Sequence, residues 1–127
     1  MTAPDLWHYT CDHGARGIGR RGLLLPVRRH DPDAAARLGP WRWLADLIWM
    51  TPMHPPDPHL LGLTANTIRC DRTAYRYRVL RPDLAQPWLG SPWHAQHPDW
   101  TTGGDDPSMW WVADQPVLVA RVSLVTA

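Results

Sequence analysis

The chain has 127 residues, which suits a single domain spanning residues 1–127 around one hydrophobic core. A formal net charge of +1 gives no strong electrostatic field, which argues against a large nucleic-acid footprint. The sequence contains no lysine and no glutamate, so mechanisms that need a catalytic glutamate are excluded and aspartate must serve instead.

The number of cysteines and the hydropathy of the chain bear on the cellular compartment that we expect for the protein. Cys11 and Cys70 are too few for a disulfide scaffold and fit a reduced protein better. The first residues lack the basic and apolar regions of a signal peptide, and no run approaches the roughly 18 apolar residues of a membrane helix. We therefore expect a cytoplasmic protein with no membrane contact.

The first predicted element is a strand over residues 6–10 that carries a histidine. Because side chains alternate along a strand, Leu6, His8 and Thr10 share one face, and Trp7 and Tyr9 share the other. A histidine in an apolar strand is either a core residue with satisfied hydrogen bonds or a ligand-binding residue at the floor of a cleft.

The remaining pattern predicts short strands and a few short helices. The clearest strand covers 75–80, where Tyr75, Tyr77 and Val79 alternate with Arg76 and Arg78. The proline-rich 52–58 segment is irregular, and residues 88–107 are predicted as a long loop. Further predicted elements are a helix over 12–21, an apolar segment over 23–27, a helix from Asp33 closed by Gly39, a helical turn over 81–86, and strands over 47–51, 64–69, 109–112 and 117–125. Such a series predicts an α+β fold with mostly antiparallel sheets and helices concentrated near the N-terminus.

The spacing of three glycines matches a dinucleotide-binding motif. Gly17, Gly19 and Gly22 match GxGxxG, but that motif requires its first glycine directly after a strand and at the start of a helix. Here a helix-like stretch intervenes, and no second βαβ unit follows. The sequence therefore argues against a Rossmann domain.

The histidines and candidate nucleophiles provide no further catalytic motif. His54 and His59, like His94 and His97, lie in loop sequences without the three or four convergent ligands of a zinc site, so no metal is predicted. No serine lies in a GxSxG elbow. Cys11 is near His8 in sequence, but a small buried cysteine is the commoner outcome.

Tryptophan is abundant, with nine residues in the chain. Tryptophan next to arginine, as in Trp41-Arg42-Trp43, suits stacking of a planar base or nicotinamide ring with arginine on phosphate oxygens. Packing in the core and at its rim explains the same residues equally well.

The opening stretch resembles small bacterial, toxin-like ADP-ribosyltransferase domains. The residues that match are Leu6-Trp7-His8-Tyr9-Thr10, Gly14-Ala15, Ile18, Gly22, Leu24 and Pro26, which cover about twenty residues. The rest of the chain matches only in the order and kind of its elements. The resemblance implies a fold of split antiparallel sheets that binds NAD between them.

Roles for individual residues follow from that resemblance. It implies that His8 holds the ribose beside the nicotinamide of NAD. Trp49-Met50-Thr51 resembles the family's aromatic-x-Thr strand, so Trp49 is expected to stack near the nicotinamide, with Thr51 beside it. Tyr9 and Thr10 are expected to line the same site, and Arg16 or Arg20 to meet the pyrophosphate.

The family's third element is an acid, usually glutamate, at the start of a late strand. It stabilises the positive ribosyl centre as nicotinamide leaves, as a carboxylate does in glycoside hydrolysis. Asp114 is the best substitute here, and its neighbour Gln115 is the alternative occupant of the position. With Gln115 there, the charge is missing.

Three functions remain open on these grounds. The first is an NAD-dependent transferase that acts on a protein or nucleic-acid acceptor and has an antitoxin or immunity partner. The second is an inactive binding module of the same fold, such as a phage accessory protein. The third is a structural module without an NAD cleft, which predicts that His8 is sealed in the core.

Overall fold

The computed structural model describes residues 4–10, 18, 22–30, 32–61, 75–100 and 106–122. These residues form antiparallel sheets with short helices, which confirms the expected α+β character. The strands are β1 (Trp7–Thr10), β2 (Leu23–Leu24), β3 (Ile48–Met50), β4 (Tyr75–Val79), β5 (Gln86–Pro87), β6 (Trp111–Ala113) and β7 (Val117–Val122). The helices are α2 (Val27–His30), α3 (Pro32–Arg37), α4 (Pro58–Leu61) and α5 (Pro92–Gln96), with 3₁₀ segments η2 (Gly39–Asp46), η3 (Pro82–Leu84) and η4 (Pro107–Met109).

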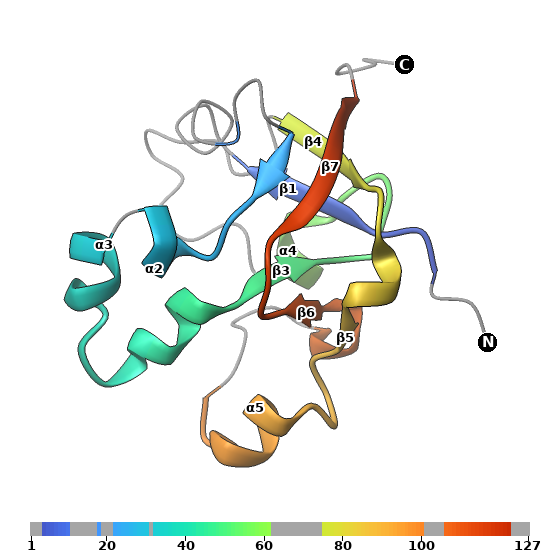
Figure 1. The fold of residues 1–127 in the computed structure, drawn as a ribbon. Coiled ribbons are helices and arrows are strands. Elements are labelled where there is room, and N and C mark those ends of the chain that lie inside the picture. The colour runs from blue at the N-terminus through green and yellow to red at the C-terminus, as the bar shows by residue number, and fades with distance from the viewer. Residues whose placement is uncertain are drawn as a thin grey trace.

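The strands form two sheets that meet at β1 and β3. One sheet has the order β1-β4-β7-β2 and the other β3-β6-β5, and each pairing between these strands is antiparallel (Figure 1). An isolated bridge joins the sheets, because Trp7 and Thr51 exchange backbone hydrogen bonds of 2.8 and 2.9 Å. The junction therefore places the predicted histidine strand beside the predicted aromatic-x-Thr strand.

The main core lies between the two sheets. The four-stranded sheet contributes residues such as Tyr77 and Val119, which alternate with more exposed residues along β4 and β7. The three-stranded sheet contributes Ile48, Met50 and Ala113 from its inward face. The alternation predicted for 75–80 is thus confirmed, because one face of β4 packs in this core.

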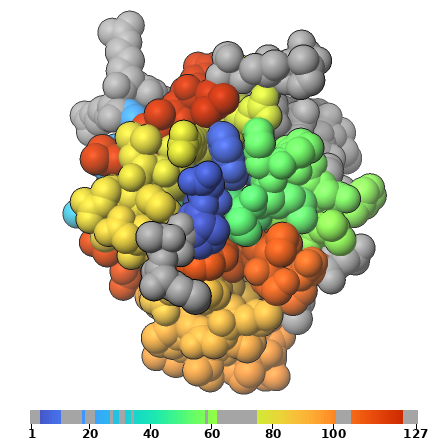
Figure 2. Space-filling view, turned by 90° about the vertical axis from the view of Figure 1, so that its right-hand side faces the viewer, coloured from blue at the N-terminus to red at the C-terminus, as the bar shows by residue number. Residues whose placement is uncertain are grey.

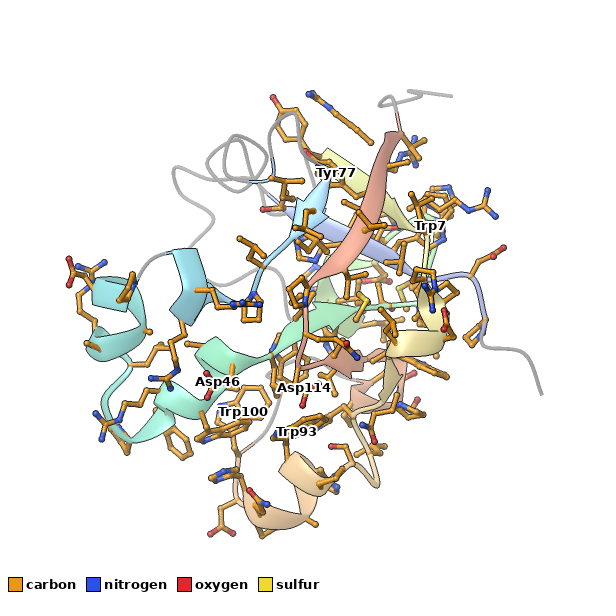
Figure 3. The ribbon with its side chains drawn as sticks, in the orientation of Figure 1. Trp7, Asp46, Tyr77, Trp93, Trp100 and Asp114 are labelled. Carbon is orange, nitrogen blue, oxygen red and sulfur yellow. The ribbon has the colours of Figure 1, made fainter. Side chains whose placement is uncertain are left out.

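A second, aromatic core covers the opposite face of the three-stranded sheet. Its buried residues are Tyr9, Leu47, Leu61, Trp88, Trp110 and Val112, and further tryptophans and methionines pack around them. Figure 3 shows two of these, Trp93 and Trp100, next to α5 and the loop that follows it. Most of the tryptophans are therefore packing residues of one cluster, whereas Trp41 on η2 is 43% exposed.

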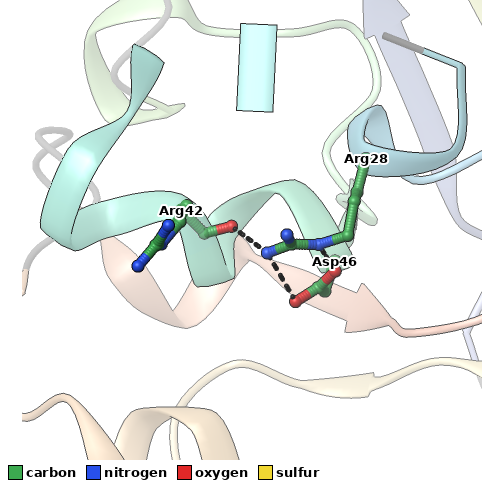
Figure 4. A network of polar contacts seen from close by, with 3 residues as sticks. All are labelled: Arg28, Arg42 and Asp46. Carbon is green, nitrogen blue, oxygen red and sulfur yellow. Dashed lines mark hydrogen bonds and ion pairs between the residues drawn. The ribbon is translucent and has the colours of Figure 1, made fainter. Parts of the chain in front are cut away.

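Three short helical segments, α2, α3 and η2, follow β2 and stand beside the sheets (Figure 1). Figure 4 shows how Arg28 on α2 fastens η2: its guanidinium donates to both carboxylate oxygens of Asp46 and, over 3.0 Å, to the carbonyl of Arg42. Gly39 separates α3 from the rest of η2 with a φ of +58°, as its predicted helix-closing role requires.

Several predicted boundaries agree with the structure and one prediction is wrong in part. The strands expected over 47–51, 109–112 and 117–125 correspond to β3, β6 and β7, and the helical turn over 81–86 corresponds to η3. The predicted loop over 88–107 contains α5, because Ser91 caps it by accepting the backbone N–H of His94 over 3.1 Å and Pro92 occupies its first turn.

Two predictions fall outside the described residues. The helix over 12–21 is described only at Ile18, which packs in the main core, and the strand over 64–69 is not described. Among the helices that are described, none has the length and apolar character needed to cross a membrane.

Candidate functional site

His8 lies on β1 at the junction of the two sheets. β1 pairs with β4, which places His8 opposite Tyr77. Its ring Nδ1 lies 2.9 Å from the carbonyl oxygen of Trp49 on β3. Because a carbonyl oxygen can only accept, Nδ1 carries the proton, and in the neutral ring the lone pair is on Nε2. The side chain is half-buried, so it is not sealed in the core as the structural-module alternative predicts.

Trp49 connects this histidine to the aromatic core. Its backbone carbonyl orients His8, and its indole lies against three other tryptophans, with ring centroids 5.1 Å from Trp88, 5.4 Å from Trp100 and 5.8 Å from Trp110. These rings hold Trp49 in one orientation, and the residue remains partly exposed. The structure therefore brings the ring of His8 to the backbone carbonyl of Trp49, 41 residues away, while the Trp49 indole lies in the aromatic core with Tyr9.

The other residues predicted on these two strands have different surroundings. Thr10 ends β1 opposite Tyr75 and is partly exposed. Thr51 has no exposed surface, and its hydroxyl accepts the backbone N–H of Met53 over 3.1 Å. Burial removes Thr51 from direct contact with a ligand in this conformation and makes it a positioning residue at the end of β3.

Tyr9 is buried in the aromatic core, on the face of β1 opposite His8. Its hydroxyl donates to the carbonyl of Met53 over 2.7 Å. Burial raises the pKa of Tyr9 to about 12, against a smaller opposing effect of the Arg76 charge. Tyr9 therefore stays neutral at physiological pH and acts as a hydrogen-bond donor rather than as a base.

Asp114 and Gln115 lie in the exposed turn between β6 and β7. Asp114 is two residues past Val112, which pairs with Trp49 in the sheet (Figure 3). Within the described part of the chain, Asp114 makes no hydrogen bond or ion pair. Its carboxylate lies in an exposed turn, and in the part of the chain that the structure describes no hydrogen bond joins it to His8.

Arg16 and Arg20, predicted to meet the pyrophosphate, lie outside the described residues, as do Cys11, Cys70 and two of the three motif glycines. Gly22 is described: its φ is +61°, and its carbonyl accepts the N–H of Val119 over 2.7 Å. This glycine therefore has a structural role in joining β2 to β7.

Sequence reasoning missed the role of His54. Its ring stacks on Trp7 with centroids 4.1 Å apart and lies within hydrogen-bonding distance of Tyr9 and Arg76. It was expected to be a solvated loop histidine, because residues on three different elements meet here and no spacing motif connects them. The expectation of no metal stays a prediction: the described residues contain no group of three or more His, Cys, Asp or Glu that could hold one.

Comparisons of the chain with protein-family models, with curated proteins and with solved structures found no match.

Proposed function

We propose that this chain is an NAD-dependent ADP-ribosyltransferase of the split-sheet type, which transfers ADP-ribose to a protein or nucleic-acid acceptor and releases nicotinamide. The observation that carries the proposal is the hydrogen bond from His8 to the carbonyl of Trp49. It joins the two strands whose residues resemble the family's histidine and aromatic-x-Thr strands, at the point where the two sheets meet.

In this proposal His8 acts through a fixed tautomer. Since Nδ1 donates to the Trp49 carbonyl, the neutral ring presents Nε2 as an acceptor, which suits a ribose hydroxyl. The aromatic core holds the ring of Trp49 rigid, so its exposed part can pack on nicotinamide without losing side-chain entropy on binding.

Asp114 has the catalytic role. As the bond between nicotinamide and ribose breaks, positive charge develops on the ribose, and a nearby carboxylate lowers the energy of that state. An aspartate is one methylene shorter than a glutamate, so the turn that carries Asp114 must approach the ribose closely.

The absence of glutamate from the chain favours one alternative, an inactive module of the same fold that binds NAD without cleaving it. The two functions differ in whether nicotinamide is released. A transferase releases nicotinamide, and the inactive module is stabilised by NAD without releasing any.

Nicotinamide release and NAD-dependent thermal stabilisation test the proposal together. With about 1 mM NAD, the native chain is expected to show both, because that concentration is at the upper end of usual KM values. His8→Ala should lose both signals. Asp114→Asn should keep the thermal shift and lose at least about tenfold in release rate, as expected for removal of a transition-state charge.

Two matched variants serve as controls, because His59 and Asp99 are exposed residues outside both motif strands. His59→Ala and Asp99→Asn should behave like the native chain. A native chain with neither a thermal shift nor nicotinamide release contradicts the proposal. A thermal shift without release, unchanged in Asp114→Asn, supports the inactive module instead.

A further inference from the structure

The segment that follows β3, residues 52–57, contacts β1 through the ring of His54 and through the hydrogen bond from Tyr9 to the Met53 carbonyl. The imidazole of His54 stacks on the indole of Trp7 with a centroid distance of 4.1 Å and an angle of 12° between the rings. In Figure 2 the N-terminal strand (blue) lies at the surface between the yellow segment and the green segment that includes these residues. His54 is exposed, so solvent protons reach it directly.

The hydrogen bonds around His54 specify a neutral ring. The Tyr9 hydroxyl donates its proton to the Met53 carbonyl over 2.7 Å, so toward His54 it can only accept. Nδ1 of His54 lies 3.2 Å from that hydroxyl oxygen and therefore carries the ring proton. Nε2 then has the lone pair, and it faces Nη1 of Arg76, which lies 3.5 Å away and donates to it.

A second proton on His54 reverses the last contact. Protonated Nε2 would be a donor that faces a guanidinium, which is also a donor and carries the same charge. Burial and the Arg76 charge already lower the pKa of His54. Among the described residues, the titratable and charged groups that face this ring are Tyr9 from β1 and Arg76 from β4. The carboxylate in its own segment, on Asp57, accepts the N–H groups of His59 and Leu60.

A second histidine in the chain forms the same stack without the cation. His97 lies on Trp43 with a centroid distance of 4.1 Å and an angle of 2°. Within the described residues no hydrogen bond or charged group engages its ring. The pair of Trp43 and His97 is therefore a matched stack that lacks the opposing cation of the Trp7 stack.

We propose that His54 is a pH-sensitive latch whose ring covers Trp7 while it is neutral and leaves Trp7 when it is protonated. The stabilisation that it contributes is complete above the ordinary histidine pKa of about 6.5 and declines as the pH falls through the lower value of the folded state. Release uncovers Trp7 and the hydroxyl of Tyr9. This latch does not depend on the proposed function, because it involves no NAD.

Fluorine NMR of the chain labelled with 5-fluorotryptophan tests the latch, since it reports on individual indoles. The signal of Trp7 is identified by its loss in Trp7→Phe, and that of Trp43 by its loss in Trp43→Phe. Broadening by a neutral gadolinium chelate measures the exposure of each ring. Between about pH 7.5 and pH 5, a range that spans histidine titration, broadening of the Trp7 signal should increase and that of Trp43 should not.

Three variants separate release from a general effect of acid. His54→Phe keeps a ring on Trp7 and cannot titrate, so its Trp7 signal should be independent of pH. Arg76→Lys keeps the opposing charge and should keep the response, whereas Arg76→Gln should lose it. The proposal is overturned if Trp7 stays equally covered at both pH values in the native chain, or if His54→Phe shows the same increase.

Discussion

At the scale of single residues, backbone conformation decides which glycines matter. Gly22 and Gly39 both have positive φ, of +61° and +58°. A Cβ atom on Gly22 would lie 2.8 Å from the carbonyl oxygen of Val119, whereas a Cβ on Gly39 would meet nothing within 4 Å. Sequence reasoning predicted Gly39 as a helix end, but it could not show that Gly22 is the crowded position and Gly39 the open one.

Alanine substitutions at these two positions should therefore differ in cost. Gly39→Ala adds only the left-handed backbone penalty, about 1 kcal/mol. Gly22→Ala adds to that penalty a collision with the backbone of β7, so we expect a loss of about 2–4 kcal/mol. Urea unfolding of the two variants measures the difference in their free energy of unfolding. Equal midpoints would contradict the prediction, because β2 and β7 would then move apart to accommodate the added Cβ without loss of stability.

At this scale, the role of His8 could be predicted from the sequence and the role of His54 could not. His8 lies in a contiguous motif, so local sequence was enough to single it out. The contacts of His54 come from β1 and β4, and its partner Arg76 is 22 residues away in sequence. Such long-range contacts leave no local pattern. Thr51 was singled out by its position in a local motif, but that position gave no indication that the residue is completely buried.

At the scale of elements, alternation and turn residues predicted most of the strands. β4 and β7 were predictable because each has one buried and one exposed face, which the period of two reports directly. α5 was not predicted, although Ser91 followed by Pro92 is a helix-start signal, because the surrounding proline, glycine and tryptophan residues were taken as a loop. The aromatic cluster that stabilises α5 is assembled by packing between residues far apart in sequence, and a local sequence pattern does not report such contacts.

The aromatic cluster should dominate stability among these elements. Trp88 is 1% exposed and contacts the rings of Trp43, Trp49 and Trp100. We expect Trp88→Ala to lower the free energy of unfolding by about 3–5 kcal/mol, because it leaves a large cavity. The control is Trp41→Ala, which removes an exposed indole and should change stability by at most about 0.5 kcal/mol. Similar losses for both variants in denaturant unfolding would contradict this assignment of the core.

At the scale of the whole molecule, β1 and β3 join the two sheets. The Trp7–Thr51 bridge links β1 to β3, the His8–Trp49 hydrogen bond lies beside it, and the His54 stack covers its outer side. The sequence predicted antiparallel sheets, yet how they join depends on pairings between distant segments. The residues of the proposed function and of the proposed latch meet at this junction.

The central claim, that NAD binds at this junction, is tested most directly by following the backbone amide signals of the native chain during an NAD titration. We expect saturable shifts at Trp7, His8 and Trp49 at up to about 1 mM NAD. The amide of Leu118, on the exposed outer face of β7, should not shift. His8→Ala should abolish the shifts at Trp49. Unchanged spectra of the native chain, or equal shifts at Trp49 in native and His8→Ala protein, would contradict the claim.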